Sequence, residues 1–320
     1  MSEKLKFFPS NALTSIDFPP ELGIIKLQSG KVRDIFELPD GNMMLVSTDR
    51  LSAFDRQVGL IPDRGHTLTR ISQWFFERTK DIVPNHLLAV PDPNVMLVRK
   101  LPTIPLEMVV RGFLTGSTET AIWTRYQKGQ RIFGGVTLYG GMKKGDPLPR
   151  PIVDPTSKAV VGHDKNLTCE EIVDSGIMTR EHYEELEAIT LALFAREQAL
   201  YKEGGLTMVD TKYEFGIDPE TGEFVLIDEN GTPDSSRLVD DKGEHFDKEY
   251  IRLWFAEQGY HGEGDPPPIP QEIIDEARSR YITVYEKLWG NKFIVPWGDP
   301  NQRIIKNVGY CLKKFNGGKK

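Results

Sequence analysis

The sequence is poor in cysteine and has no long apolar run. It contains only two cysteines, Cys169 and Cys311, whose separation matches neither a metal site nor a redox motif, so free thiols in a reducing compartment are expected. No stretch approaches the roughly 20 apolar residues that a membrane span requires, and the amino terminus lacks the apolar core of a signal peptide. These absences predict a cytoplasmic protein without a membrane partner.

The chain also lacks an excess of basic residues. Its 40 lysines and arginines are outnumbered by 47 aspartates and glutamates, and the net charge of −7 gives no support to a nucleic-acid partner. Any phosphate-binding site must therefore depend on a few nearby basic residues and not on the net charge of the chain. The 320 residues, of which 39% are hydrophobic and 27% charged, suffice for two globular domains or one large two-lobed domain, and a monomer is compatible with this composition.

The stretch from Leu206 to Arg237 combines a hairpin pattern with many charges. Turn residues 218–222 separate two segments rich in β-branched and aromatic residues. A turn centred near Glu220 predicts that Lys212 lies opposite Asp228. The same register places Glu214 opposite Leu226.

Because side chains alternate along a strand, this register predicts an apolar face made of Val209, Tyr213, Phe215, Val225 and Ile227. The other face would carry Asp210, Lys212, Glu214 and Asp228. Three carboxylates around one lysine fit two interpretations. One is a solvated sheet face with ion pairs, and the other is an oxygen-ligand cluster for Mg²⁺ beside a nucleotide phosphate.

Two segments near the amino terminus present polar groups at the ends of predicted strands. In the first, Gly30-Lys31-Val32-Arg33, alternation directs both cations the same way, which fits either a solvated basic turn or a cover over a phosphate. The second, residues 47–55, is a polar loop after a hydrophobic strand and contains Asp49, Arg50 and Ser52. Loops held by rigid strands are common places for binding sites.

The middle of the chain adds further ionisable groups. Glu107 and Arg111 share a face of a predicted strand, where they either pair with each other or present Arg111 to an anionic substrate, with Ser117 as a further donor. Residues 134–162 are expected to be a loop, either on the surface or ordered by a ligand. Helical patterns are expected at 67–80, after a Thr168 cap, at 179–203, from an Asp247 cap to 259, and at 270–290.

Seven segments occur in order along the chain: GKVRDIF (30–36), STDRLSAFD (47–55), EMVVRGFLTGS (107–117), PTSKA (155–159), GHDKN (162–166), VDTKYEFG (209–216) and DENGTPDSSR (228–237). Together they resemble the phosphoribosylaminoimidazole-succinocarboxamide synthase family, the SAICAR synthetases of purine biosynthesis. The long loop before Pro155 and the helical carboxyl-terminal extension are similar to the longer, fungal-type form of this family.

The resemblance implies an α+β, two-lobed ATP-grasp-like fold that grips ATP, with a helical carboxyl-terminal extension. It implies a β-rich lobe at 1–104 that covers the ATP phosphates, a second α+β lobe at 105–260 with the hairpin and the substrate site, and the extension at 261–320. The implied activity is a carbon–nitrogen ligation of L-aspartate to carboxyaminoimidazole ribonucleotide (CAIR), which yields SAICAR, ADP and phosphate. An acyl phosphate would activate the CAIR carboxylate.

The resemblance also implies roles for individual residues. The ATP-binding set would be Gly30, Lys31, Val32, Arg33, Lys100, Glu214 and Asp228, of which Glu214 and Asp228 would hold Mg²⁺. The substrate-binding set would be Asp49, Arg50, Ser52, Arg111, Ser117, Asp234, Ser236 and Arg237. The catalytic set would be Lys212, Asp210, Lys158 and Asp164, with the aspartates as candidate proton acceptors and Lys158 neutralising charge during phosphoryl transfer.

Two other functions would use part of this chemistry. An ATP-dependent small-molecule kinase would stop after phosphoryl transfer, and a nucleotide-binding regulator would retain the nucleotide without turnover. The ligase is favoured because Arg111, Ser117 and Arg237 form an anion-binding set beyond what ATP needs. A binding-only relative is expected to have lost Glu214 or Asp228, and both are present.

Overall fold

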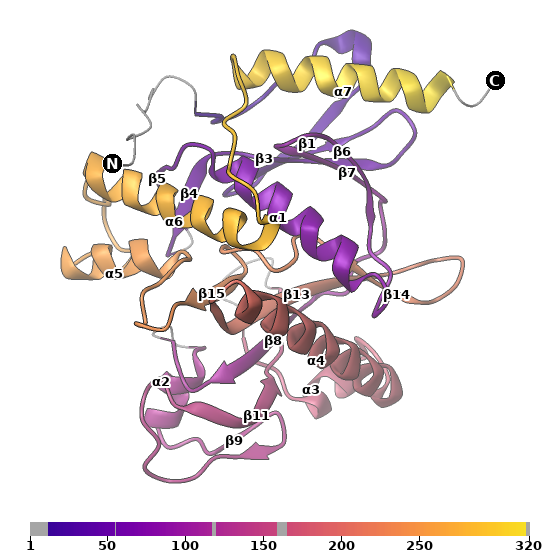
Figure 1. The fold of residues 1–320 in the computed structure, drawn as a ribbon. Helices are drawn as coiled ribbons and strands as arrows, with labels where there is room; N and C mark the ends of the chain where they lie inside the picture. The colour runs from indigo at the N-terminus through magenta and orange to yellow at the C-terminus, as the bar shows by residue number, and fades with distance from the viewer. Residues whose placement is uncertain (1–11, 55, 117–119, 159–164, 318–320) are drawn as a thin grey trace. The chain divides into compact units, whose positions relative to one another are not determined.

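The computed structural model describes residues 12–54, 56–116, 120–158 and 165–317 (Figure 1). By their contacts these residues form two compact units. The first contains the described parts of 1–73, 87–100 and 248–320, and the second contains 74–86 and the described parts of 101–247. Both units combine helices with antiparallel sheet, so the α+β prediction is confirmed. The predicted lobe boundaries after residues 104 and 260 stay predictions.

The first unit is built on a five-stranded sheet in the order β1-β2-β3-β7-β6. Its strands are β1 (Ile25–Ser29), β2 (Arg33–Glu37), β3 (Met43–Ser47), β6 (Leu87–Asp92) and β7 (Val95–Val98). Helix α7 (Pro300–Gly317) packs against this sheet, since Ile304 and Val308 join Val46 and Leu97 in one buried core. Helix α7 was not predicted as a separate helix, although its apolar residues recur at helical spacing.

A second core of the first unit surrounds the hairpin of β4 (Arg50–Ala53) and β5 (Arg56–Leu60). Helix α1 (Arg64–Thr79), which begins in this unit and ends in the other, contributes Leu68, while α5 (Glu249–Glu257) and α6 (Gln271–Trp289) contribute Phe255 and Tyr281. Helix α6 ends at Gly290, which has a φ of 68° and closes the last turn. The helices predicted at 67–80 and 270–290 are confirmed.

The predicted cap of α5 was wrong. Lys248 occupies the cap position, and Asp247 instead accepts a hydrogen bond from the backbone N–H of Leu238 at 2.7 Å.

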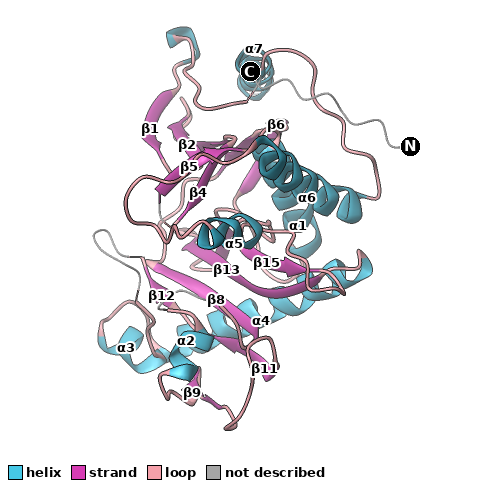
Figure 2. Cartoon of the chain, turned by 90° about the vertical axis from the view of Figure 1, so that its left-hand side faces the viewer, coloured by secondary structure: helices cyan, strands magenta, loops and turns pink. Residues whose placement is uncertain are grey.

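The second unit is organised by a sheet in the order β11-β8-β13-β14, with β12 also paired to β8 and β15 to β13. The strands are β8 (Leu106–Phe113), β11 (Pro147–Val153), β12 (Thr156–Ser157), β13 (Thr207–Ile217), β14 (Phe224–Ile227) and β15 (Ser236–Val239). Helix α4 (Arg180–Glu203) lies along one face of this sheet (Figure 2). Thr179 caps α4, and Thr168 caps the short helix α3 (Cys169–Asp174) in the predicted capping box.

The described part of the segment 134–162, residues 134–158, contains more regular structure than predicted, because β10 (Val136–Thr137), β11 and β12 lie within it. Three prolines in β11 concealed the strand in the sequence, and β11 tolerates them because it is an edge strand of its sheet. Helix α2 (Ile122–Gln127) and the short strand β9 (Ile132–Phe133), which pairs with β10, precede this segment.

The β13–β14 hairpin exists, but its predicted register was wrong by one residue. Glu214 lies opposite Ile227, not opposite Leu226. In this register a longer β14 would place Asp228 opposite Tyr213 and not opposite Lys212. Because opposed residues share a side, Val225 and Ile227 lie on the side of Glu214 and not on the predicted apolar face. Alternation could not separate the two registers, since both sides are buried here.

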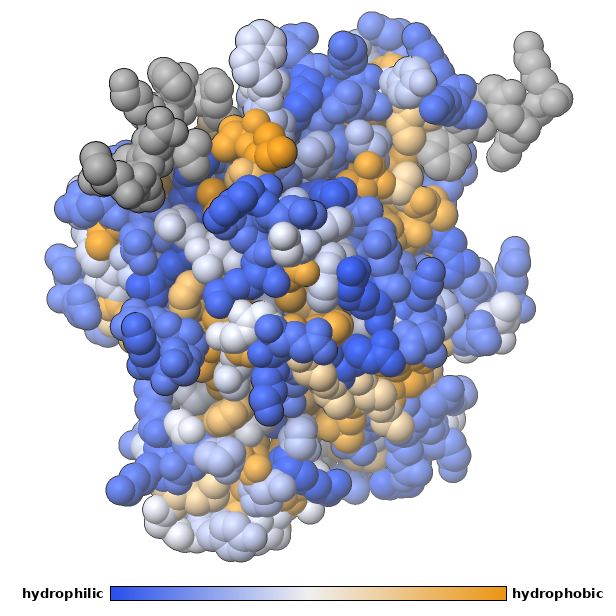
Figure 3. All heavy atoms as spheres, viewed as in Figure 1, coloured by the Kyte–Doolittle hydropathy of each residue, from blue (hydrophilic) through white to orange (hydrophobic). Residues whose placement is uncertain are grey.

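No helix of the described chain is long and apolar enough to span a membrane. On the face drawn in Figure 3, hydrophilic side chains predominate and apolar side chains form scattered patches.

Candidate functional site

Lys212 lies at the centre of a cluster of charges in the second unit, which we call the lysine–carboxylate cluster. Its Nζ atom is 2.8 Å from Oε1 of Glu107, 2.9 Å from Oε1 of Glu214 and 4.0 Å from Oδ2 of Asp228. The other oxygen of Glu214 accepts a hydrogen bond from Lys158. Three carboxylates therefore share two ammonium groups. Glu214 and Asp228 lie beside Lys212 as predicted, but the third predicted carboxylate, Asp210, pairs with Arg237 instead, and Glu107 takes its place.

Strand pairing explains most of this cluster. Lys212 and Glu214 are two residues apart on β13 and so point to the same side. Lys212 pairs with Val109 of β8, which brings the side chain of Glu107 within diagonal reach. Lys158 directly follows β12, whose Thr156 lies opposite Glu107. Strands β12 and β13, which are distant in sequence, thus bring their side chains to Glu107 because both pair with β8.

Asp228 reaches the cluster by a different route. It is the first residue after β14 and has a φ of 64°, the left-handed conformation that aspartate tolerates better than most residues. In the observed register a continued strand would turn Asp228 away from Glu214. The left-handed residue breaks the alternation, and its carboxylate lies instead beside Lys212.

The electrostatics of the cluster define what Lys212 can do. Burial opposes its charge, but Glu214, Glu107 and Asp228 outweigh this effect and raise the pKa of Lys212 well above its ordinary value. Lys212 is therefore a permanent cation near neutral pH. It can neutralise a phosphoryl group, but it cannot serve as a general base.

A second cluster, rich in arginine, lies on the same sheet. Asp210 of β13 is flanked by Arg111 of β8 and Arg237 of β15, which are its cross-strand partners on either side. An oxygen of Asp210 is 2.5 Å from Nη1 of Arg237. Next to this pair, the hydroxyls of Thr211 and Ser236 are 2.8 Å apart. Two arginines on the strands that flank β13 are suited to binding phosphate or carboxylate groups.

Asp154 organises the arginine cluster and was not found in the sequence. Its Oδ2 atom accepts hydrogen bonds from Nε of Arg111 at 2.6 Å, from Asn166 at 3.1 Å, and from Arg125. Glu107 and Arg111, which could have paired with each other, bind Lys212 and Asp154 instead. The only signal for Asp154 was its place directly before PTSKA, and Arg125 had no signal.

Other predicted residues of the second unit lie near these clusters or outside the described chain. Gly116 has a φ of 98°, and a Cβ atom there would lie 2.6 Å from Cβ of Ala121, so only glycine fits at this position. Asp234 lies in the turn before β15 and donates its N–H to the Thr232 hydroxyl at 3.2 Å. Ser117 and Asp164 lie outside the described residues.

In the first unit, the turn Gly30-Lys31-Val32-Arg33 is held by contacts from the segment predicted as a polar loop. That prediction was wrong for residues 50–53, which form strand β4. The N–H of Gly30 donates to the carbonyl of Arg33 at 2.7 Å, and the Thr48 hydroxyl donates to the carbonyl of Val32 at 2.7 Å. Arg50 donates to the carbonyl of Gly30 at 2.9 Å and to Asp34 at 2.8 Å. Arg50 therefore shapes the turn that carries the predicted phosphate-binding cations.

Asp49 links the polar loop to helix α1. Its two oxygens accept hydrogen bonds from the N–H groups of Gly65 at 2.9 Å and Leu13 at 2.8 Å, so it caps the first turn of the helix. Burial raises the pKa of Asp49 to about 6. Ser52, also predicted to border substrate, has its hydroxyl 3.4 Å from Nζ of Lys248.

We expect Asp49→Ala to lower the free energy of unfolding by about 2 kcal/mol or more, because two buried N–H groups lose their acceptor. Urea denaturation measures this loss, and Asp241→Ala in an exposed turn is the control. If Asp49→Ala left stability unchanged and altered only substrate binding, the capping role would be contradicted.

Lys100 and the connector that follows it were predicted to contact ATP. The Lys100 side chain is 53% exposed and lies 3.1 Å from Glu37. In the second unit, Thr103 bridges Gly216 of β13, and the flanking hydrogen bonds use the carbonyl of Pro102 and the N–H of Ile104. In such a pair the backbone groups of Thr103 point away from β13, where they can meet a ligand.

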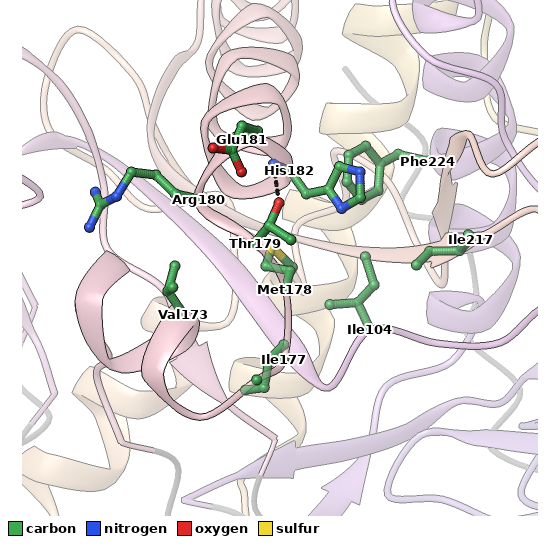
Figure 4. A pocket seen from close by; sticks show the side chains of 11 residues that line it. Ile104, Val173, Ile177, Met178, Thr179, Arg180, Glu181, His182, Ile217 and Phe224 are labelled. Carbon is green, nitrogen blue, oxygen red and sulfur yellow. Dashed lines mark hydrogen bonds between the residues drawn. The ribbon is translucent and has the colours of Figure 1, made fainter.

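The second unit also contains a cavity of about 560 Å³ near the start of α4 (Figure 4). Its walls are mainly apolar and include Ile104, Met178, Ile217 and Phe224. None of the predicted ligand residues lines it. The cavity is therefore separate from the two charged clusters.

A sequence model of the SAICAR synthetase family matches residues 26–267. The chain belongs to the SAICAR synthetase family. The phosphoribosylaminoimidazole-succinocarboxamide synthase of Legionella pneumophila (strain Lens) is 42% identical over 306 residues, which cover 90% of this chain and 96% of the relative. A putative second synthase of Agrobacterium fabrum is 44% identical over 301 residues, which cover 90% of this chain and 94% of the relative.

Solved structures of the SAICAR synthetase family agree with this assignment. The SAICAR synthase of Saccharomyces cerevisiae complexed with SAICAR has a TM-score of 0.76 at 31% identity, covering 89% of this chain and 100% of the yeast chain. The fold prediction is confirmed. The chain is an ATP-dependent ligase of purine biosynthesis, as predicted.

The donor set of this SAICAR synthetase family member suits a magnesium ion that arrives with a nucleotide. Glu214 and Asp228 supply the carboxylate oxygens that Mg²⁺ prefers. Among the described residues, no group of three or more histidine, cysteine or carboxylate side chains is arranged to hold a metal ion. A pair of carboxylates is an incomplete shell, and phosphate and water oxygens are the usual completion.

Proposed function

We propose that the chain joins L-aspartate to CAIR with hydrolysis of ATP, giving SAICAR, ADP and phosphate. The observation that carries this proposal is the coexistence of two charged clusters on one sheet. The lysine–carboxylate cluster around Lys212 suits a metal–nucleotide, while the arginine cluster suits a second anionic substrate. ATP alone would need only the first of these.

The chemistry of the proposed reaction begins with a carboxylate that cannot lose oxide directly. The CAIR carboxylate attacks the terminal phosphoryl group of ATP, ADP leaves, and an acyl phosphate forms. The aspartate amine then attacks the acyl carbon, and phosphate leaves. Lys158 and Lys212 neutralise charge on the transferred phosphoryl group. Asp210 or Asp164 accepts the proton released by the amine.

The remaining residues bind and orient the substrates. Arg111, Arg237, Ser117 and Ser236 hold the phosphate and carboxylate of CAIR, with Asp234, Asp49, Arg50 and Ser52 at its border. The turn Gly30-Lys31-Val32-Arg33 covers the ATP phosphates, with Lys100 and the connector after it near the nucleotide. Glu214 and Asp228 hold Mg²⁺, which when bound screens the phosphates and fixes their orientation.

ADP release is expected to require L-aspartate as well as CAIR. The test is a coupled ADP assay with CAIR, run with and without L-aspartate, together with detection of SAICAR by mass. ADP release that is indifferent to aspartate, with phosphorylated CAIR as the product, would contradict the ligase and support a kinase.

We also propose the cytoplasm as the compartment, because Cys169 and Cys311 are free thiols, which persist in a reducing environment. A monomer is the proposed state in solution, and light scattering during gel filtration measures it.

A further inference from the structure

Glu197 is a fully buried acid that the proposed reaction does not use. It lies on α4 with no exposed surface and points toward β13. The groups that approach its carboxyl are the Tyr213 hydroxyl and the Asn230 amide, although within the described chain neither is placed for an ideal hydrogen bond. A buried acid on a helix behind the lysine–carboxylate cluster needs an explanation.

The surroundings of Glu197 favour a neutral carboxylic acid. The titratable groups that face it are Tyr213 from β13 and Tyr201 from α4 itself, and Asp247 acts on Tyr201. Burial raises the pKa of both tyrosines well above the ordinary value, so they stay neutral. No cation of the described chain is among the groups that act on Glu197, and burial raises its pKa to about 8.

The partners of Glu197 are the immediate neighbours of the proposed metal ligands. Tyr213 lies between Lys212 and Glu214 on β13, with its side chain on the opposite side of the strand. Asn230 follows Asp228 by two residues. The Glu197 carboxyl therefore contacts both Tyr213, the neighbour of Glu214, and Asn230, which lies two residues after Asp228.

The turn after Asp228 is also fixed from this side. The Tyr201 hydroxyl donates to the carbonyl of Gly231, and the Asn230 amide donates to the Thr79 hydroxyl at 3.3 Å. Gly231 has a φ of 61°, and a Cβ atom there would lie 2.4 Å from the ring of Phe75, so the turn has no space to shift toward that ring. A charge on Glu197 would enter this tightly packed region.

We propose that Glu197, as a neutral acid, is a positioning residue that places Glu214 and Asp228 by holding Tyr213 and the turn 229–231. The proposal rests on the proposed function, where these two carboxylates act on Mg²⁺ and ATP. Ionisation of Glu197 places an uncompensated charge behind the sheet, which loosens the turn and lowers turnover.

The test compares Glu197→Gln, Glu197→Leu and the unmodified protein by kcat, KM for ATP and melting temperature from pH 5 to 9.5. Glutamine keeps the size and polarity but cannot ionise. We expect Glu197→Gln to retain at least about half of the turnover at pH 7 and to lose the fall in activity that the unmodified protein shows above pH 8. Glu197→Leu is expected to lower kcat about 10-fold at every pH, because it cannot hydrogen-bond.

Stability supplies a second readout. The pKa of Glu197 rises from 4.5 to about 8 on folding, so its stabilising contribution is complete below pH 4.5 and is lost as the pH rises through 8. The melting temperature of Glu197→Gln relative to the unmodified protein should therefore increase between pH 5 and 8 and then stay constant. Glu187→Gln, a half-buried acid on the same helix, is the control and should leave the alkaline fall in activity unchanged.

Three results would overturn the proposal. A glutamine variant as inactive as the leucine variant would show that the charge is needed. An unchanged alkaline fall in the glutamine variant would assign that fall to another group. The expected stability change without any change in activity would make Glu197 structural only. Failure of the proposed function itself is distinguishable, because the unmodified protein would then show no aspartate-dependent ADP release.

Discussion

Asp228→Asn is expected to lower ATP-dependent turnover by about 100-fold or more while the melting temperature stays within about 2 °C of the unmodified protein. The loss follows from replacing one of two proposed carboxylate ligands of Mg²⁺ by a neutral amide, which is a weaker ligand, and from removing one negative charge beside Lys212. Stability is preserved because asparagine also adopts the left-handed conformation that Asp228 has, with a φ of 64°. Steady-state kinetics at several Mg²⁺ concentrations and thermal denaturation measure both effects.

Asp63→Asn is a matched control for Asp228→Asn. Asp63 is also left-handed, with a φ of 62°, and it also binds a cation, Arg278, but it belongs to the first unit and is not one of the proposed ligands. Its substitution should leave turnover unchanged. If Asp228→Asn mainly lowered the melting temperature and kept its turnover, the carboxylate would be a structural partner of Lys212 and the proposed metal site would be wrong.

Arg237→Lys is expected to lower kcat/KM for CAIR by roughly 10- to 100-fold while KM for ATP stays within about two-fold. Lysine retains the charge beside Asp210, so the pair at 2.5 Å is replaced by another ion pair and the fold is kept. What is lost is the planar guanidinium, which can bind an anion with two parallel hydrogen bonds. Titration of CAIR at saturating ATP, and of ATP at saturating CAIR, separates the two effects.

The control for Arg237→Lys is Arg278→Lys. Both arginines are largely buried and bind a carboxylate, with side chains 15% and 13% exposed respectively, but Arg278 pairs with Asp63 outside the arginine cluster. Its kinetics should match those of the unmodified protein. If Arg237→Lys raised KM for ATP and left the kinetics with CAIR unchanged, Arg237 would be assigned to nucleotide binding and not to CAIR binding.

In the β13–β14 hairpin, sequence patterns predicted the positions of the strands but not their register. Turn residues and alternation located β13 and β14 correctly, and Lys212, Glu214 and Asp228 do come together. The predicted register failed because apolar residues occupy both sides of β14. Asp228 reaches the cluster because its φ is positive. Aspartate tolerates a positive φ, but its presence in a sequence does not predict one.

Contacts between residues far apart in the sequence were mostly not predicted. Asp154 binds Arg111 across 43 positions of sequence and Arg125 across 29, and no local period relates them. The roles of Asp49 and Arg50 were also hard to predict from sequence. Both were expected to border a substrate, and both bind backbone groups of their own unit. A polar side chain that caps a helix and one that borders a ligand have the same signature in sequence, and only the position of the partner atoms separates them.

The left-handed backbone at Asp228 restricts which substitutions evolution can accept there. Asparagine and glycine adopt this conformation readily but carry no charge, whereas glutamate keeps the charge but has a longer side chain and a strain of about 1 kcal/mol or more. A position that demands both a left-handed residue and a short carboxylate admits a single amino acid. Selection is therefore expected to tolerate almost no drift at this codon, while exposed acids of the 218–223 turn can vary freely.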